Sequence, residues 1–185
     1  ARTVEVDANS AGAARADATG INVSLGGAVG ASIARATLSP TVSATIGQRS
    51  LIDAADFTLA AHQALPAGGG RSAFASASGA AGGLLVGANA SRSTAFNDAA
   101  VNARVGDDST LKISGTATVQ THNTHSQLAY VSGVSAGFVA VGANTASAGS
   151  NTDSHAALGD HVRVEGGTLN VLADGQATNH AYGVA

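Results

Sequence analysis

The sequence repeats itself about every 57 residues, and four short motifs recur in the same order. The first motif, Val-Gly-Ala, lies at 29–31, 86–88 and 141–143, with spacings of 57 (86 − 29) and 55 (141 − 86). The second, Ala-x-aliphatic-Gly-polar, lies at 44–48, 103–107 and 156–160. A short alternating segment occupies 4–8, 57–61, 117–121 and 169–173, and a segment ending in Gly occupies 16–20, 75–79, 129–133 and 179–183. Such self-similarity is typical of an array of stacked structural units.

Within each repeat the pattern is that of β-strands. Apolar residues alternate with polar ones, as in Val4-Glu5-Val6-Asp7 and Val42-Ser43-Ala44-Thr45-Ile46, so one face points inward and the other outward. The connections vary in length, and the longest holds the breaker-rich segment 65–70. Solenoids tolerate such insertions because they bulge outward without disturbing the stack. We therefore predict an all-β parallel β-helix (β-solenoid) of about three ~57-residue repeats, with about five or six short strands each.

The composition favours close approach of the walls of this β-helix. Charged residues make up 11% and aromatics 3% of the chain, and the 44% hydrophobic fraction is dominated by Ala and Val. Small side chains reach native packing density only where backbones lie close together, which predicts a flattened interior. A repeat of this length predicts two turns of about 28 residues or three of about 19, and a rod of roughly 30–50 Å.

We expect residues 1–185 to form a single β-solenoid segment, a window cut from a longer array. No polar capping repeat is evident at either end of the sequence, although solenoids need one to stay soluble.

Charge and motif content exclude several classes of function. The net charge is −3 and the nine basic residues are scattered, so we expect no nucleic-acid binding. The uncharged stretch between Arg71 and Arg92 contains a nominal GxxxG, but it is interrupted by serines and has few large apolar residues, so no membrane span is predicted. The chain has no Cys, which excludes disulfides and thiol catalysis.

The alternating segments 42–47 and 169–173, with Val-Gly-Ala strands between them, resemble the repeats of giant filamentous-haemagglutinin-like and leukotoxin-type adhesins, the large exoproteins of Gram-negative bacteria. The resemblance covers nearly the whole chain and rests on repeat texture, without a catalytic signature. It implies a right-handed parallel β-helix, secreted unfolded across the outer membrane and displayed at the cell surface.

One polar column is a candidate ligand-binding stripe. Three residues beyond the centres of the aligned strands lie Asn9, His62, His122 and Asp174, outside the core or at a turn. A polar column without a ligand is the alternative.

Other polar motifs have simpler explanations. His122 and His125 form an H-x-x-H, which we place on a loop as surface polar residues because no third metal ligand is near. The Gly-Asp pairs at 106–107 and 159–160 suggest turns, since the calcium-binding nonapeptide of β-rolls is missing. Asp53 and Asp56 lie close together, but their repeat equivalents are not acidic. We assign no catalytic, cofactor or metal residues.

The sequence thus predicts a structural or adhesive shaft of a secreted surface or filament-forming protein, such as those of biofilms, and not an enzyme. Its partners would be neighbouring repeats of the same chain, with homotypic fibre or lateral assembly and a host or cell-surface ligand as further options. The alternative is a carbohydrate-binding or polysaccharide-degrading β-helix domain. A third option, an ice-binding face, would need regular Thr-x-Thr rows, which the aligned positions lack.

Overall fold

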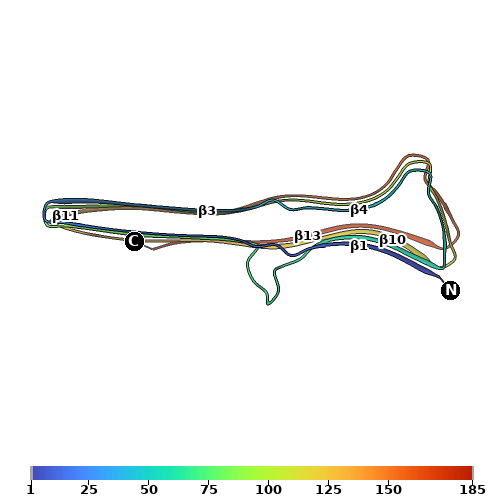
Figure 1. Cartoon of the computed structure of the whole chain (residues 1–185), viewed down its shortest axis with the longest axis horizontal. Helices are drawn as coiled ribbons and strands as arrows, with labels where there is room; N and C mark the ends of the chain where they lie inside the picture. The colour runs from blue at the N-terminus through green and yellow to red at the C-terminus, as the bar shows by residue number, and fades with distance from the viewer. Residues whose placement is uncertain (1, 185) are drawn as a thin grey trace.

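The computed structural model describes residues 2–184, and every regular element in this range is a β-strand. The predicted all-β class is therefore confirmed. The strands form three separate sheets in which all pairs are parallel (Figure 1). Sheet A contains β1 (Thr3–Ser10), β2 (Ala14–Ser24), β6 (Asp56–Gln63), β7 (Ala73–Gly83), β10 (Thr116–Ala136) and β13 (Thr168–Val184). Sheet B contains β3 (Gly27–Leu38), β4 (Thr41–Ile46), β8 (Val86–Val105) and β11 (Val139–Leu158), and sheet C contains β5 (Leu51–Ala54), β9 (Thr110–Ile113) and β12 (Arg163–Glu165).

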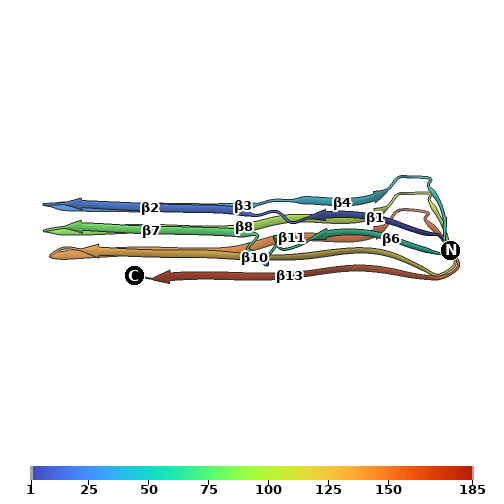
Figure 2. The same ribbon diagram turned by 60° about the horizontal axis from the view of Figure 1, so that its bottom comes forward.

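Each copy of the repeat passes once through sheets A, B and C, and we call one such pass a layer. The first layer is β1 to β5, the second β6 to β9 and the third β10 to β12, while β13 begins a fourth. Figure 2 shows the layers side by side, from β2 at one side to β13 at the other. Paired residues are 53 positions apart between β1 and β6 (Thr3 to Asp56) and 52 between β10 and β13 (Thr116 to Thr168).

The prediction of two or three turns per repeat was wrong, because each strand pairs with its counterpart one whole repeat away. The three layers and β13 therefore stack to roughly 15–20 Å, at about 4.8 Å per layer, rather than 30–50 Å. The prediction of five or six short strands per repeat fits the first layer, which has five strands, but not the second and third layers, which have four and three. The segments rich in Ala, Ser and Gly keep the alternation without a break, so they join into strands of 20 residues in β8 and 21 in β10.

The insertion at 64–72 lies outside the stack, as predicted. It connects β6 to β7 and projects away from the sheets (Figure 1). The pairing offset is 53 before the insertion (Thr3 to Asp56) and 59 after it (Ala14 to Ala73), because this connection is six residues longer than its counterpart at 11–13. The neighbouring strands pair in register on both sides of it.

Two of the four predicted motifs are aligned in space as the sequence indicated. The alternating segments pair through Val6, Leu59, Val119 and Val171. The Ala-x-aliphatic-Gly segments also pair in register.

The other two motifs each contain one copy that is displaced by two residues. Val29 and Val141 both pair with Ala88, so the Val-Gly-Ala at 86–88 is out of line with the other two copies. Gly183 pairs with Val131 rather than with Gly133. A slip of two residues keeps every side chain on its face of the sheet, so alternation alone cannot detect it.

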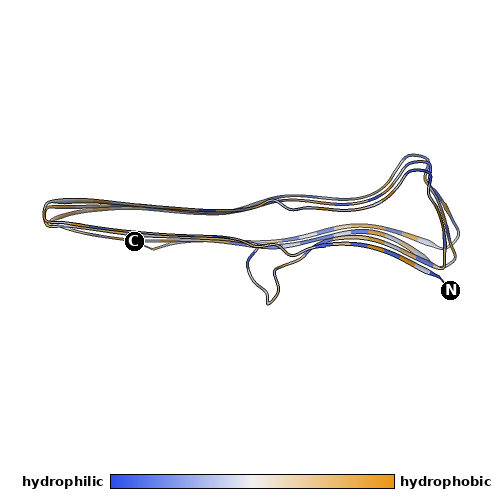
Figure 3. Cartoon of the chain, viewed as in Figure 1, coloured by the Kyte–Doolittle hydropathy of each residue, from blue (hydrophilic) through white to orange (hydrophobic). Residues whose placement is uncertain are grey.

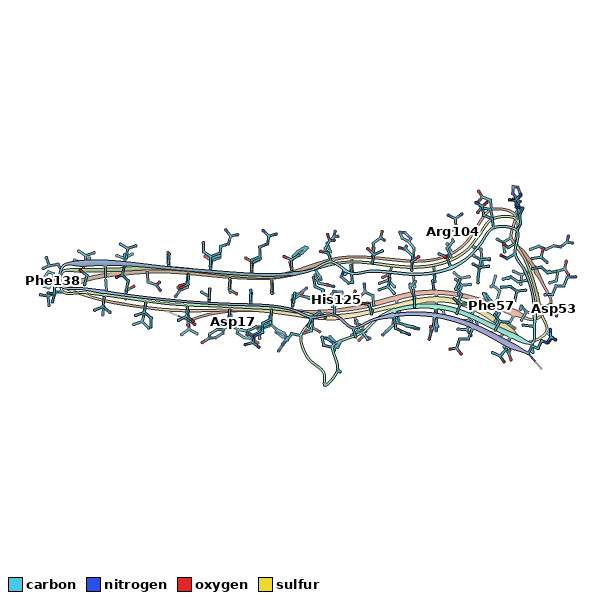
Figure 4. All side chains as sticks on the ribbon, in the orientation of Figure 1. Asp17, Asp53, Phe57, Arg104, His125 and Phe138 are labelled. Atoms are coloured by element: carbon cyan, nitrogen blue, oxygen red, sulfur yellow. The ribbon has the colours of Figure 1, made fainter. Side chains whose placement is uncertain are left out.

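The interior is divided into two apolar clusters. Large side chains, including Phe57, Leu59 and Leu111, fill the wide end between all three sheets. Alanines, such as Ala75 and Ala95, fill the narrow part between sheets A and B. Figure 4 shows both sets of side chains directed between the sheets, with Phe57 in the wide end. The flattened interior predicted from composition is therefore confined to one part of the molecule.

The glycines of the fourth motif make room for polar side chains on the facing sheet. Gly79 and Gly133 pair with each other in sheet A. A Cβ at either position would overlap the amide of Asn89, which donates a hydrogen bond from Nδ2 to the Gly79 carbonyl at 3.2 Å. Asn89 occupies the position of Gly30 and Gly142 in its own column, and the glycines of the facing sheet provide the room for its amide.

Candidate functional site

The predicted column of Asn9, His62, His122 and Asp174 is confirmed. Each of these residues pairs with the next across sheet A. They lie within β1, β6, β10 and β13 rather than at a turn, and alternate with inward residues, so they face outward. The column therefore crosses all the layers of the sheet.

Each of the two histidines on this face lies next to one carboxylate. His62 Nε2 lies 3.6 Å from Asp7 Oδ1, and His122 Nδ1 lies 3.1 Å from Asp174 Oδ2. The other ring nitrogen of His122 is hydrogen-bonded to Thr124 Oγ1 at 2.9 Å. Both nitrogens of His122 are thus engaged within the protein, which leaves no lone pair for a metal ion.

The H-x-x-H pair does not form a joint site. Both histidines lie in β10, and an odd separation in a strand places them on opposite faces. The prediction that this segment is a loop was therefore wrong for both histidines. The prediction of a surface position was wrong for His125, which is 2% exposed and points into the interior (Figure 4). Within residues 2–184, no three His, Cys, Asp or Glu side chains are grouped in a way that could hold a metal ion.

Burial lowers the pKa of His125. Its neighbours in the interior, Gln63, Asn97, Asn123 and Gln127, are uncharged and cannot stabilise an imidazolium ion by charge. Its Nδ1 lies 3.1 Å from Asn123 Oδ1, and because that oxygen can only accept, Nδ1 carries the proton. The neutral ring is therefore the form that fits the fold.

We expect the free energy of unfolding to fall as the pH is lowered from about 6.5. The unfolded chain binds a proton at His125 near pH 6.5, whereas the folded chain binds it only at a lower pH. The stability is complete above 6.5 and is lost as the pH falls through the folded-state pKa, with a slope of up to about 1.4 kcal/mol per pH unit. Urea unfolding at a series of pH values measures this, and His125→Gln should flatten the profile whereas His155→Gln, on the exposed face, should not. Equal slopes for the two variants would contradict this assignment.

The Gly-Asp pairs form turns, as predicted. Asp107 Oδ1 accepts hydrogen bonds from the Asp160 main-chain N–H at 3.0 Å and from Arg104 Nη2 at 2.7 Å. The hydrogen bond from Asp160 has the largest effect on the pKa of Asp107, and together with the bond from Arg104 it lowers that pKa. The next residues in each layer, Arg49, Asp108 and His161, have φ values of 56°, 58° and 55°. One turn conformation is thus repeated in three layers and joined by hydrogen bonds between them.

A groove of about 780 Å³ lies at the wide end, where sheet C meets sheet A. Asp53, Lys112 and Glu165 form an outward column along it, one from each layer. Arg2 also lines the groove, and the lining contains no aromatic side chain. The groove thus presents two carboxylates separated by a lysine.

Asp56, the other acid of the close pair noted in the sequence, has a structural contact. Its Oδ1 accepts a hydrogen bond of 2.9 Å from the Thr116 main-chain N–H, at the start of the strand in the next layer. Asp56 is not among the residues that line the groove, so Asp53 and Asp56 do not converge on one cleft.

An apolar ridge at the narrow end was not predicted from the sequence. We define the ridge as Leu25, Leu84, Leu85 and Phe138, which occupy the turns between sheets A and B in successive layers. Leu25 and Phe138 are both 91% exposed, and Figure 4 shows Phe138 at the tip. Main-chain hydrogen bonds join the layers here, from Leu85 N to Gly26 O and from Phe138 N to Leu84 O.

The ridge lies in a zone without charge. Residues 18–34, 72–91 and 126–152 contain no Asp, Glu, Lys, Arg or His. Figure 3, which is coloured by hydropathy, shows hydrophobic and hydrophilic residues alternating along the strands, most clearly at the wide end. Contiguous exposed apolar surface of this kind marks interaction sites. Three uncharged stretches at the repeat spacing were the signal that could have revealed it.

The last layer presents a second exposed apolar surface. Leu169 and Val171 belong to inward columns, but they are 39% and 43% exposed because no strand within residues 2–184 covers β13 on its far side. Their counterparts Phe57 and Leu59 are fully buried in the middle of the stack.

Comparison with known proteins gives no relative. No family model, curated protein or solved structure matches the chain. Within residues 2–184 the structure also has no helix of the length and apolarity required to cross a bilayer. The function must therefore be argued from the surfaces described above.

Proposed function

We propose that this chain is a structural and adhesive segment of a secreted, filamentous-haemagglutinin-like surface protein of a Gram-negative bacterium. In this proposal sheets A, B and C are the three walls of a right-handed parallel β-solenoid. The observation that carries the proposal is the pairing of every strand of sheets A, B and C with its counterpart one repeat away. Such stacking can be extended indefinitely, since each layer forms the template for the next.

The dimensions of a layer favour a role in displaying surface rather than a role in spanning length, because each layer uses many residues and adds little length. A layer uses 52 to 60 residues, judged by the pairing offsets, and adds only about 4.8 Å along the stack. Most of each layer therefore forms broad outer faces. A segment of this shape is suited to presenting repeated rows of side chains. The apolar ridge is one such row, and the column of Asn9, His62, His122 and Asp174 is another.

The exposed surface of β13 supports association along the stack. Leu169 and Val171 are half-exposed, and the outer edge of β13 carries main-chain groups that no strand pairs with in residues 2–184. A further layer, from the same chain or from another copy, would cover these side chains and complete the ladder.

We expect beads coated with the chain to be retained on cell surfaces under flow, and the combined substitutions Leu25→Asp, Leu84→Asp and Phe138→Asp to release them. The new carboxylates would have to lose water on contact with an apolar partner surface, so retention should fall about tenfold or more. Flow-chamber microscopy counts the retained beads.

The matched control is Thr94→Asp, Gln120→Asp and Thr178→Asp, which adds the same charge on outward positions of strands. This variant should retain beads like the unmodified chain. Absence of retention by the unmodified chain, or equal release by both variants, would refute the adhesive part of the proposal. Cleavage of a polysaccharide that is lost in Asp53→Asn would instead support the β-helix enzyme alternative, with the charged groove as its site.

A further inference from the structure

A band of polar side chains crosses the interior between the two apolar clusters. We define the inner polar band as Gln63, Asn97, Thr121, Asn123, His125 and Gln127, all of them at most 2% exposed. Figure 4 shows His125 about midway along the molecule, between the sheets. The band spans two layers, because Gln63 pairs with Asn123, and it spans both sheets, because Asn97 lies in β8 of sheet B.

The hydrogen bonds within the band satisfy only a part of its polar atoms. Gln63 Nε2 donates to Asn97 Oδ1 at 3.5 Å, and His125 Nδ1 donates to Asn123 Oδ1 at 3.1 Å. The atoms left without a protein partner are Gln63 Oε1, Asn97 Nδ2, Thr121 Oγ1, Asn123 Nδ2, His125 Nε2, and both Nε2 and Oε1 of Gln127. An unpaired buried polar atom costs about 1–3 kcal/mol, so seven of them need partners that the side chains do not supply.

The chemistry of these atoms defines the partner. Asn97, Asn123 and Gln127 offer N–H donors, whereas Gln63 Oε1, Gln127 Oε1 and the unprotonated His125 Nε2 offer acceptors. A metal ion requires acceptors only, and a halide requires donors only. Rotating an amide by a half turn exchanges its oxygen and nitrogen, so each amide still carries one donor group and one acceptor. The band has no ionised side chain, and its partner must both donate and accept.

We infer that the inner polar band is a binding site for ordered water, held between sheets A and B. A buried water molecule makes about three hydrogen bonds, and two or more such molecules would pair the seven atoms. Gln63 is the last residue of β6, and the insertion at 64–72 leaves the stack at this point. The water therefore joins the ordered strand β10 to the end of β6 and to the facing sheet. This inference does not depend on the proposed function.

Nuclear magnetic resonance of the whole chain in solution tests the inference. Water bound in the band should give slow-exchange cross-peaks from the water line to the side-chain amide protons of Gln127 and Asn123. Gln127→Met, which keeps the length of the side chain and removes its polar atoms, should abolish the cross-peak to Asn123 or weaken it severalfold. Gln120→Met is the matched control, because Gln120 lies on the outward face of the same strand, and it should leave the cross-peak unchanged.

The unmodified chain decides the question even if a variant fails to fold. Lack of water cross-peaks at Gln127 and Asn123 in the folded chain would overturn the inference, as would cross-peaks that persist in Gln127→Met. Crystals grown with sodium bromide separate water from an anion, since an anomalous bromide peak within the band would also overturn it. Bromide-free density at hydrogen-bond distance from the unpaired atoms would support it.

Discussion

The substitution Phe57→Ala should lower the free energy of unfolding by about 3–5 kcal/mol, the range measured for large-to-small changes at buried aromatic residues. Phe57 is fully buried and is the largest side chain in the wide-end cluster. Its partners in the column are Val4 in the first layer and Ala117 in the third, so no larger side chain is placed to fill the space left behind. Urea unfolding followed by circular dichroism measures the change.

Phe138→Ala is the matched control for this prediction. The ring of Phe138 is 91% exposed on the apolar ridge, so its removal should change the free energy of unfolding by no more than about 0.5 kcal/mol. If the two alanine variants were equally destabilised, the wide end would not be the packed core of the fold. If neither were, the interior would be looser than the structure describes.

The contrast between these two residues shows what the sequence could predict. At the wide end, large apolar residues alternate with polar ones and the strands of sheet B end at a Gly-polar turn, so the register of Val6, Leu59, Val119 and Val171 followed from the pattern. In the narrow part most inward residues are Ala, Ser and Gly, so neighbouring positions of the same parity are nearly equivalent. The copy at 86–88 was therefore placed two residues from its true position.

The path of the chain was harder to predict than its faces. Alternation assigns each residue to the inside or the outside, but it does not say where a strand turns. Pro40 interrupts sheet B between β3 and β4 in the first layer, while the second layer has no breaker there and β8 continues. The number of turns per repeat therefore depended on the lengths of uninterrupted strands, which the short motifs did not reveal.

The candidate sites divide in the same way. The outward column of Asn9, His62, His122 and Asp174 was predictable because its members lie at aligned positions of the repeat. The inner polar band was not, because His125 and Gln127 pair with Ala177 and Asn179 in the next layer, so the band is peculiar to one part of the stack. The alternation did contain a signal for the inner polar band, because His125 and Gln127 each lie an even number of residues from the inward Val119 and so face the same way.

Gly87→Ala should be the other strongly destabilising change among those considered, by about 1–3 kcal/mol, as for an overpacked core. Gly87 faces inward in β8, and a Cβ there would overlap the main-chain oxygen of Ala136 and lie 3.0 Å from its carbonyl carbon. The obstacle is backbone, so the strain can be relieved only by moving β10 away from β8. Thermal unfolding should show a midpoint about 2–12 °C lower, given roughly 2–4 °C per kcal/mol for a chain of this size.

Gly142→Ala provides the comparison, because Gly142 also faces inward in sheet B but its added Cβ would meet only Ser135 Oγ, at an ordinary 3.6 Å. This variant should be neutral or stabilised by about 0.4–1 kcal/mol, through the reduced freedom of the unfolded chain. Equal destabilisation of both variants would mean that the narrow part resists any added methyl group, whereas no effect of either would mean that sheets A and B can separate there. Since Gly87 lies two residues from Leu85, the spacing that it permits between the sheets also fixes the width of the apolar ridge.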